Sequence, residues 1–315
     1  MLLAHELPLV DLERALEVAR QQGNASQILS LSEQLMQMRA QVYRDLTVVE
    51  RLAICRHPHR PRARRIVQAM VSEWVELHGD RQFAEDHALL AGFGTIGAQR
   101  CMILAQDRGH STEERIRSRF GMMNPEGYRK AVRMLQLAAR AHLPVVTMID
   151  TPGAYPGLEA EERGQGWAIA RAIAAMMDHP TPIASLILGD GCSGGALGLG
   201  VADRLAILEN GYYSVISPEG CASILWRDPQ KAGQAAAALK LQAQDLQTAG
   251  MIDHILPEPL GGAHRDPESL IGTVKAYLEE TLAALSVIPQ ESLLQARYQR
   301  HRSVGSILCL NREPS

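Results

Sequence analysis

Aromatic residues are scarce in this chain, at 4% of 315 residues. The hydrophobic fraction of 46% therefore comes mainly from Ala, Leu, Ile, Val and Met, which predicts a core of aliphatic side chains. No hydrophobic run approaches the roughly 18 residues typical of a membrane-spanning helix. Residues 1–10 also lack the basic region that begins a signal peptide. These absences favour a cytoplasmic protein with no attachment to a membrane.

Cysteine pairs with metal-binding spacing are also missing. The cysteines are Cys55, Cys101, Cys192, Cys221 and Cys309, and they form no C-x-x-C motif. We interpret them as reduced thiols rather than as ligands of a zinc site. The sequence therefore predicts no metal ion in this chain.

A strong charge of either sign is absent, because 32 basic and 35 acidic residues leave a formal net charge of −3. Nothing in this balance favours specific binding of nucleic acid. The one basic cluster, residues 57–65, reads H-P-H-R-P-R-A-R-R. It could bind phosphate groups or nucleic acid, but no aromatic residues are interleaved with its arginines. We favour a solvated connection whose arginines pair with carboxylates.

The organisation of the chain is predicted from its polar and hydrophobic pattern. Residues 1–25 are polar and mixed, and we expect them to be loosely ordered. Residues 26–65 form an N-terminal helical segment, in which hydrophobic residues from 28 to 42 recur every three or four positions. That helix could pack on this chain or on a partner subunit. Residues 66–290 form the main domain, and residues 291–315 form a polar C-terminal tail.

Strands and helices alternate through the main domain, which is typical of an α/β fold. Residues 89–97 and 100–106 are predicted to form a β-hairpin. Two similar units of strand, glycine turn and helix follow, with strands at 143–149 and 182–188. The other predicted elements are strands at 205–208, 213–216 and 250–256, and helices at 127–142, 161–177, 232–248 and 267–285.

A glycine-rich stretch, residues 189–200, follows the second of these strands and reads G-D-G-C-S-G-G-A-L-G-L-G. Its G-x-G-x-x-G spacing fits a dinucleotide site, with Glu209 as the ribose-binding acid. Its G-x-S-x-G spacing fits the nucleophile elbow of a hydrolase, with Ser193 as the nucleophile. Alternatively, residues 194–196 could donate backbone N–H groups to an oxyanion. Tight packing alone would also explain the glycines.

The first two of these functions make further demands on the sequence. A serine hydrolase needs an acid and a histidine after Ser193. Asp203 or Asp228 with His254 or His264 is available, but nothing in the spacing singles out a pair. A dinucleotide site is expected at the start of a Rossmann domain, whereas this stretch lies behind a similar unit. Both functions are therefore disfavoured.

Several longer runs along the chain are more distinctive than the glycine motif. They are F-G-M at 120–122, P-E-G-Y-R-K-A at 125–131, I-D-T-P-G-A-Y-P-G at 149–157, A-E-E-R-G-Q at 160–165, S-G-G-A-L at 193–197, Y-S-V-I-S-P-E-G-C-A-S-I-L-W at 213–226 and I-L-P-E-P-L-G-G-A-H-R at 255–265. Together they resemble the α subunit of the carboxyltransferase of bacterial acetyl-CoA carboxylase. The resemblance covers about residues 26–300, in order and nearly without gaps.

This resemblance implies a ClpP/crotonase-like fold, which is a spiral of ββα units. It implies transfer of a carboxyl group to acetyl-CoA from carboxybiotin, which the biotin carboxyl carrier protein carries. The product, malonyl-CoA, begins fatty acid biosynthesis. A β subunit with a zinc ribbon and most of the CoA site would complete the enzyme as an α2β2 heterotetramer. That heterotetramer would work with biotin carboxylase in an ATP-binding complex.

The resemblance also implies site residues. The catalytic positions are Gly194, Gly195 and Ala196, where the N–H groups of the last two would hold the acyl thioester oxygen and the partner's matching turn would hold the carboxybiotin carbonyl. No side-chain base is then required, because the biotin nitrogen can take the proton once CO₂ leaves it. The expected substrate-binding residues are Gly153, Ala154, Tyr155, Pro156, Gly157 and Arg163. Core packing of Tyr155 and helix capping near Arg163 stay open as alternatives.

Three places depart from the usual pattern of the family. Residues 190–192 read D-G-C where E-G-G is usual, and residues 108–110 read R-G-H where a basic run like K-G-R is usual. Trp167 stands where small or polar residues are usual. These departures leave the identity of the substrate's acyl group open. The alternative to the acetyl-CoA enzyme is a paralogous acyl-CoA carboxyltransferase or decarboxylase of a specialised pathway.

Overall fold

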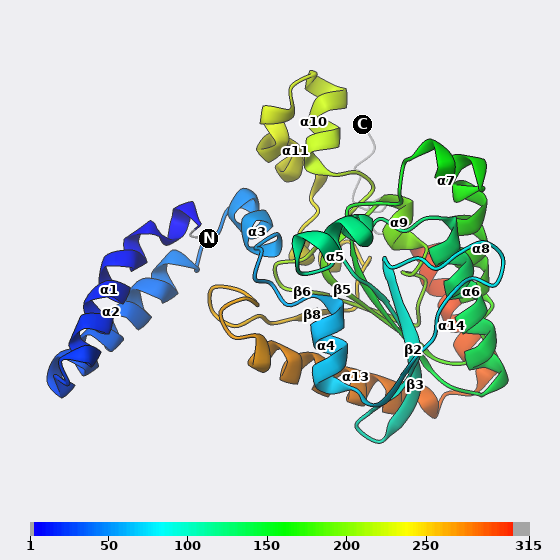
Figure 1. The fold of residues 1–315 in the computed structure, drawn as a ribbon, viewed down its shortest axis with the longest axis horizontal. Helices are drawn as coiled ribbons and strands as arrows, with labels where there is room; N and C mark the ends of the chain where they lie inside the picture. The colour runs from blue at the N-terminus through cyan, green and yellow to red at the C-terminus, as the bar shows by residue number, and fades with distance from the viewer. Residues whose placement is uncertain (1–2, 305–315) are drawn as a thin grey trace, which may run out of the picture.

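The computed structural model describes residues 3–304, and its centre is an eight-stranded sheet (Figure 1). The strands are β1 (Ser72–Glu76), β2 (Leu89–Ile96), β3 (Gln99–Gln106), β4 (Val145–Thr151), β5 (Ile183–Cys192), β6 (Arg204–Leu208), β7 (Tyr212–Ser214) and β8 (His254–Leu256). Their order is β1-β2-β3-β4-β5-β6-β8, and β7 pairs with the end of β5. The first two pairings are antiparallel and the others are parallel. The predicted α/β class is confirmed.

Helices cover both faces of this sheet. α6 (Pro125–Arg140) and α8 (Gln165–Met177) pack on one face, and α4 (Ala63–Met70) and α13 (Pro267–Ser286) pack on the other (Figure 1). The other α-helices are α1 (Leu7–Gln21), α2 (Ala25–Val42), α3 (Val48–Cys55), α5 (Thr112–Arg117), α7 (Leu158–Glu162), α9 (Ser193–Leu197), α10 (Pro218–Trp226), α11 (Ala232–Leu239), α12 (Ala243–Thr248) and α14 (Gln290–Ser303). The parallel strands are therefore buried on both faces, as the near-continuous apolar runs in their sequences require.

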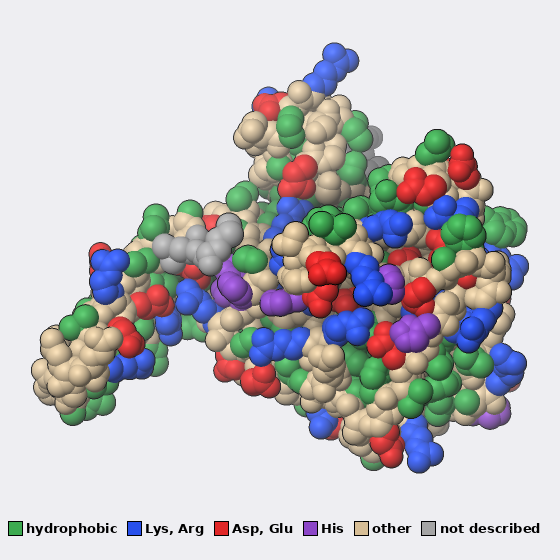
Figure 2. Space-filling model, viewed as in Figure 1, with side chains coloured by type: hydrophobic (Ala, Val, Ile, Leu, Met, Phe, Trp, Pro, Cys, Tyr) green, Lys and Arg blue, Asp and Glu red, His purple; other side chains and the backbone are tan. Residues whose placement is uncertain are grey.

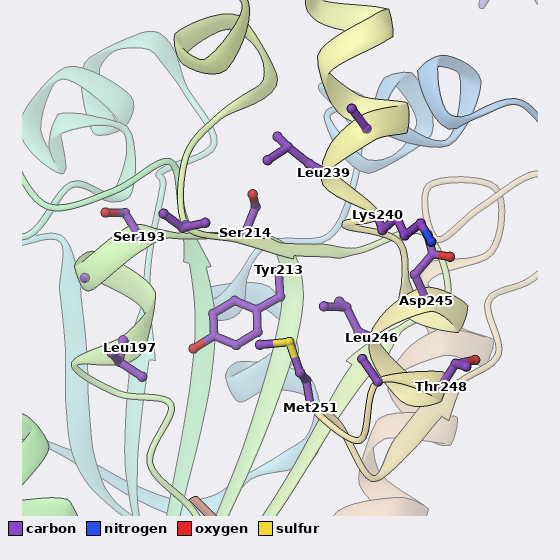
Figure 3. A pocket seen from close by; sticks show the side chains of 14 residues that line it. Ser193, Leu197, Tyr213, Ser214, Leu239, Lys240, Asp245, Leu246, Thr248 and Met251 are labelled. Atoms are coloured by element: carbon purple, nitrogen blue, oxygen red, sulfur yellow. The ribbon is translucent and has the colours of Figure 1, made fainter. Parts of the chain in front are cut away.

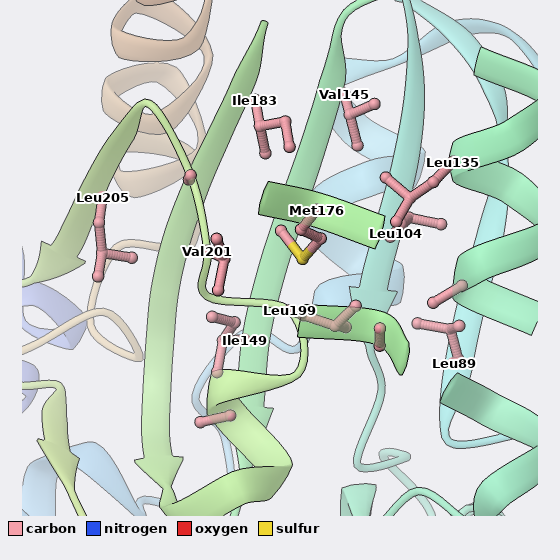
Figure 4. Packing of buried hydrophobic residues seen from close by; sticks show 14 of the residues in the cluster. Leu89, Leu104, Leu135, Val145, Ile149, Met176, Ile183, Leu199, Val201 and Leu205 are labelled. Carbon is pink, nitrogen blue, oxygen red and sulfur yellow. The ribbon is translucent and has the colours of Figure 1, made fainter. Parts of the chain in front are cut away.

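The core consists of two aliphatic layers, one on each side of the sheet. Side chains alternate along β4, so Val145 and Ile149 join the cluster under α6 and α8 (Figure 4). Val146 and Met148 join the cluster under α4 and α13. All four are fully buried. The aliphatic core predicted from the scarcity of aromatic residues is confirmed.

Most predicted elements are present, but two predicted helices are each broken in two. β2 and β3 form the predicted hairpin, with Leu90 opposite Ala105. The helix predicted at 161–177 is instead α7 and α8, because Gly164 between them has a left-handed φ of +81°. The Ala-rich stretch likewise divides into α11 and α12 at Lys240, with φ +47°. A left-handed residue ends a helix because it turns the chain off the helix axis.

β5 is longer than predicted and contains the first two glycines of the 189–200 stretch. Asp190 and Gly191 lie in the strand, opposite Tyr212 and Tyr213 of β7. A dinucleotide site needs a tight turn at these glycines, so the G-x-G-x-x-G interpretation is wrong. Gly191 serves packing instead, because a Cβ there would lie 3.0 Å from the carbonyl oxygen of Tyr212.

The N-terminal segment is more ordered than predicted. α1 and α2 form a helical hairpin that projects from the body of the molecule (Figure 1). Leu9 and Leu16 of α1 are buried in one cluster with Leu35 of α2. The heptad helix therefore packs on this chain. The expectation that residues 1–25 are loosely ordered is wrong for the described part, because the leucines of α1 form a second apolar stripe that matches the first.

The C-terminal segment also departs from the prediction of a polar tail. α14 packs on the body through Arg297, whose guanidinium donates to both carboxylate oxygens of Asp203 at 2.8 Å. The same guanidinium donates to the carbonyl oxygens of Met176, His179 and Thr181. A buried charge with all its donors satisfied can stabilise a helix contact. Residues 305–315, including Cys309, lie outside the described part.

The basic cluster of residues 57–65 is occupied by ion pairs. Arg60 pairs with Glu258 at 2.6 Å and Arg62 with Asp150 at 2.9 Å. Arg64 pairs with Asp107, and Arg65 with Glu268. The expected pairing with carboxylates is confirmed, but the expected solvated connection is wrong at Arg60 and Arg62, which are buried. On the face shown in Figure 2, blue basic side chains are interspersed with red acidic ones instead of forming one patch.

The described cysteines are buried free thiols, namely Cys55, Cys101, Cys192 and Cys221. Within residues 3–304, no group of three or more His, Cys, Asp and Glu side chains is arranged to hold a metal ion. No helix of that part of the chain has both the length and the apolar character needed to cross a membrane.

Candidate functional site

Two glycine turns meet at the carboxyl ends of β4 and β5. One is residues 153–157 after β4, and the other is the start of α9 after β5. A Cβ at Gly195 would clash with the backbone of Gly153 and Ala154. The carboxyl ends of parallel strands at adjacent positions are where open α/β sheets usually bind ligands. The structure thus brings together two groups of residues that the sequence analysis assigned to one site.

Buried polar side chains hold the start of α9 in place. The carbonyl oxygen of Gly195 accepts a hydrogen bond from Gln106 Nε2 at 2.9 Å and a longer one from the Tyr128 hydroxyl at 3.4 Å. Gln106 ends β3 and Tyr128 lies in α6, and both are fully buried. The peptide that follows Gly195, including the N–H of Ala196, is therefore fixed by two elements that are distant in the sequence.

The backbone changes direction sharply at Ser193, which has a left-handed φ of +60°. α9 begins at this residue and is five residues long. In a helix that begins at Ser193, the N–H groups of Ser193, Gly194 and Gly195 have no acceptor within the helix. The first turn of α9 can therefore direct amide donors at an anionic oxygen.

The other turn is held by side chains rather than by packing. Thr151 Oγ1 accepts from the N–H of Gly153 and donates to its carbonyl. The N–H of Tyr155 donates to the carbonyl of Met123, and Gln165 Nε2 donates to the carbonyl of Tyr155. These bonds fix the path of the turn.

The exposed side of this turn differs from residue to residue. Ala154 and Tyr155 are half-buried, whereas Pro156 is exposed. The Tyr155 ring lies under the Arg119 guanidinium, 5.0 Å from its centroid. A Cβ at Gly157 would clash with the Tyr155 ring. The turn therefore presents the partly exposed Ala154 and Tyr155 and the exposed Pro156 beside Gly195.

Arg163 has a different environment from the other predicted binding residues. Its Nε donates to Glu126 Oε1 at 2.6 Å, and its guanidinium lies 4.7 Å from the centroid of the Phe83 ring. The hydrogen bond to Glu126 raises the pKa of Arg163 above its usual value. The carbonyl oxygen of Arg163 accepts from Arg129. These contacts tie the end of α7 to the start of α6 and not to Gly195, so the geometry favours a supporting role.

An apolar cavity of about 760 Å³ opens beside the start of α9 (Figure 3). Ser193, Gly194 and Leu197 form one wall, and the opposite wall comes from the 238–240 and 245–251 segments. Tyr213 and Met251 project into the space between these walls, as Figure 3 shows. The sequence analysis missed these lining residues, because they come from four elements that become neighbours only through the parallel pairing of β5 with β7.

Ser193 lacks the partners of a catalytic serine. The cavity beside it has no histidine among its described lining residues. Of the proposed partners, Asp203 is occupied by Arg297, and the His264 ring stacks on His57 with centroids 3.7 Å apart. His254 lies edge-on to Tyr277. The elbow-like spacing is therefore explained by the bend from β5 into α9 and not by nucleophilic chemistry.

The departures from the family pattern lie in different places. Cys192 is 2% exposed and forms the last residue of β5, and burial raises the pKa of its thiol to about 11. Its thiol is therefore a packing group at neutral pH. Trp167 is 73% exposed on α8, well outside the core.

Comparison with solved structures identifies the fold. The chain resembles transcarboxylase 12S with a TM-score of 0.55 and 17% identity, over 70% of this chain and 42% of that one. It resembles the β subunit of Pseudomonas aeruginosa geranyl-CoA carboxylase with a TM-score of 0.56 and 17% identity, over 78% and 46%. It also resembles a Pseudomonas malonate decarboxylase hetero-tetramer in complex with coenzyme A, with a TM-score of 0.55 and 20% identity, over 71% and 90%. The fold is thus the crotonase-like fold of carboxyltransferases, as predicted.

Sequence comparison narrows the class to a family. The family described as "Acetyl co-enzyme A carboxylase carboxyltransferase-like" matches residues 2–305. The acetyl-coenzyme A carboxylase carboxyl transferase subunit alpha of Protochlamydia amoebophila is 48% identical, over 98% of this chain and 99% of that protein. The protein of the same name from Chlamydia pneumoniae is 46% identical over 96% of each. The chain belongs to the acetyl-CoA carboxylase carboxyltransferase family, and the resemblance identified from its motifs is confirmed.

Proposed function

We propose that this chain is the α half of an acetyl-CoA carboxyltransferase. It transfers a carboxyl group from carboxybiotin, carried on a biotin carboxyl carrier protein, to the methyl carbon of acetyl-CoA, and the product is malonyl-CoA. The observation that carries this proposal is the contact of Gly195 with Gly153 and Ala154 at the ends of β4 and β5. The names of its relatives favour acetyl-CoA over the acyl group of a specialised paralogue.

The chemistry needs oriented backbone donors more than reactive side chains. Removal of a proton from the acetyl methyl group puts negative charge on the thioester oxygen. The N–H groups at positions 194–196 stabilise this charge, because they lie at the start of α9, where amide donors are not all used within the helix. The displaced proton goes to the biotin nitrogen that loses CO₂. No residue of this chain then needs to act as a base.

The substrate-binding residues have two different roles in this proposal. The turn formed by Gly153, Ala154, Tyr155, Pro156 and Gly157 contacts the reacting groups, because its backbone touches Gly195. Arg163 acts indirectly, through its ion pair with Glu126 at the start of α6. The apolar cavity beside α9 accommodates a non-polar part of a substrate.

The chain supplies only half of the site. We propose that a β subunit with a zinc ribbon supplies the second glycine turn and most of the CoA site, in an α2β2 assembly. Biotin carboxylase and ATP binding belong to other chains of this complex. We propose a cytoplasmic location, since the acyl-CoA substrates are cytoplasmic metabolites.

Reconstitution tests this proposal directly. The isolated chain should show no transfer between malonyl-CoA and biotin, and the activity should appear when a zinc-ribbon β subunit is added. A matched control is the β subunit alone, which should also be inactive. Robust exchange by the isolated chain would contradict the half-site proposal, and absence of exchange in the purified complex would contradict the proposed reaction.

A further inference from the structure

A buried group of charged side chains lies behind the two glycine turns. Asp150 lies near the end of β4, before residues 153–157, and Asp190 lies near the end of β5, before α9. Arg108 follows β3 and reaches both carboxylates. Its Nη1 lies 2.9 Å from Asp190 Oδ2 and 3.4 Å from Asp150 Oδ1. One guanidinium therefore joins the two strands that carry the two turns.

The surrounding contacts make this arrangement rigid. The N–H of Asp190 donates to Asp150 Oδ1 at 3.2 Å, so the two strand ends are also linked directly. Arg62 Nη1 pairs with the other oxygen of Asp150 at 2.9 Å. The side chains of Asp150 and Asp190 are each 2% exposed, so water does not screen these pairs. Removing one member of a buried ion pair leaves an uncompensated charge, which makes such a group sensitive to substitution.

The second partner of Asp190 extends the group toward α10. Arg56 Nε lies 3.5 Å from Asp190 Oδ2, and Arg56 Nη1 pairs with Glu219 at 2.6 Å. The Cys55 thiol donates to Asp190 Oδ1 at 3.4 Å. Burial alone raises the pKa of Asp190, but the Arg108 and Arg56 guanidiniums outweigh it and hold the pKa below its usual value. Asp190 is therefore ionised at neutral pH and occupied on both oxygens.

The ion pair of Arg108 with Asp190 joins a long basic side chain to a short acidic one. Arginine is longer than lysine, and aspartate is one methylene shorter than glutamate, so the 2.9 Å contact depends on the combined length of the two side chains. Because one nitrogen, Nη1, reaches both carboxylates, the contacts depend on the reach of the base more than on the plane of a guanidinium.

We propose that Arg108 is a positioning residue that sets the spacing of the two glycine turns, and that it does so as a length-matched pair with Asp190. Arg108 does not touch the reacting atoms. It fixes the ends of β4 and β5, and these strands place Gly153 and Gly195 in contact. A displacement of about 1 Å in a reacting geometry can cost roughly 10²-fold in rate, so a small change in this pair reaches the chemistry. The role rests on the carboxyltransferase function proposed above.

The experiment is a double-substitution cycle in the complex of this chain with its β subunit. Arg108→Lys shortens one partner and Asp190→Glu lengthens the other, and both keep the charges. Each single variant should lower kcat about tenfold, while KM for malonyl-CoA stays within about twofold, because placement of the turns changes more than substrate binding. The double variant R108K/D190E should recover kcat to within about threefold of the unsubstituted complex.

Two further measurements separate positioning from folding. Arg64→Lys is the matched control, because Arg64 pairs with Asp107 and Glu76 outside this group and its kcat should not change. The thermal unfolding midpoint of each variant is measured in parallel. Equal losses of kcat in the double variant and the worse single variant would overturn the length-matched pair. Single variants that lose thermal stability but keep kcat would overturn the positioning role.

The outcome is also separable from the proposed function. An inactive unsubstituted complex would contradict the carboxyltransferase itself, and in that case the unfolding midpoints still decide whether Arg108 and Asp190 are coupled. An active unsubstituted complex with independent, additive losses in the two single variants would contradict only the pair.

Discussion

The two glycine turns use glycine for different physical reasons. Gly153 has a φ of +144°, and a Cβ there would meet nothing within 4 Å. Gly195 lies in helical backbone, and a Cβ there would clash with the backbone of Gly153 and Ala154. The first turn therefore needs glycine for its conformation, and the second needs it for space. The two backbones touch only if the first turn has its special conformation and the second turn leaves space for it.

The two turns also differ in which side chains hold them in place. The turn at Gly153 is fixed by local side chains, chiefly Thr151 and Gln165. The turn at Gly195 is fixed by Gln106 and Tyr128, which come from distant parts of the chain. The side chains that support the first turn therefore lie near it in the sequence, whereas those that support the second come together only in the assembled sheet.

The largest effect is expected from Gly195→Ala. The new methyl group forces Gly153 and Ala154 away from α9, and overpacking of this kind costs about 1–3 kcal/mol of stability. Displacement of an oxyanion donor costs roughly 10²–10³ in kcat. We expect both losses in the reconstituted complex, measured by thermal unfolding and by steady-state kinetics.

Gly166→Ala is the control for that variant, because Gly166 lies on α8 with nothing within 4 Å of its Cβ position. A helical Gly→Ala exchange there should raise stability by roughly 0.5–1 kcal/mol and leave kcat unchanged. If Gly195→Ala matched this control in both measurements, the contact between the turns would not be a functional one.

A smaller effect is expected from Gly153→Ala. Space is available, so the cost is that of a left-handed conformation, about 1–3 kcal/mol of stability. No atom opposes the new methyl group, so kcat should fall less than in Gly195→Ala. The comparison of the two unfolding midpoints and the two kcat values is the measurement. A larger loss of kcat in Gly153→Ala than in Gly195→Ala would contradict the view that the first turn needs glycine for its conformation and the second needs it for space.

The smallest effect is expected from Ser193→Ala. Ser193 has no histidine beside it among the described cavity residues, so its hydroxyl performs no nucleophilic step. Activity should stay within about threefold, since a weak neutral hydrogen bond contributes only about 0.5 kcal/mol. A fluorophosphonate probe should leave the native protein unlabelled. Stoichiometric labelling at Ser193 would restore the hydrolase interpretation.

The elements with local signals were predictable from the sequence. Thr47 and Glu50, three positions apart, form a capping box at the start of α3. The alternation of β2 and β3, separated by a two-residue connection, gave the hairpin. The motif runs identified the family and the two turns. These features depend on residues close together in the chain, where propensity and pattern act directly.

The prediction failed where the decisive partner is remote. Residues 3–22 are mostly helical because α2 offers them an apolar stripe, and α14 is held because Arg297 finds Asp203. The helix predicted at 161–177 failed for a local reason instead, because Gly164 has a left-handed φ. A polar segment that packs on a buried partner has the same kind of sequence pattern as a polar segment that does not.

The sequence by itself determined the α/β class, the family and the aliphatic core, because hydrophobic periodicity and long motif runs are local properties of the chain. Only the tertiary structure decided that Gly195 touches Gly153 and Ala154, that Arg163 supports α6, and that Arg108 bridges Asp150 and Asp190. Parallel pairing of β4 with β5 places residues about 40 positions apart at one sheet edge. The distances between residues at that edge depend on how helices pack on both faces of the sheet. No single segment of the sequence specifies this packing.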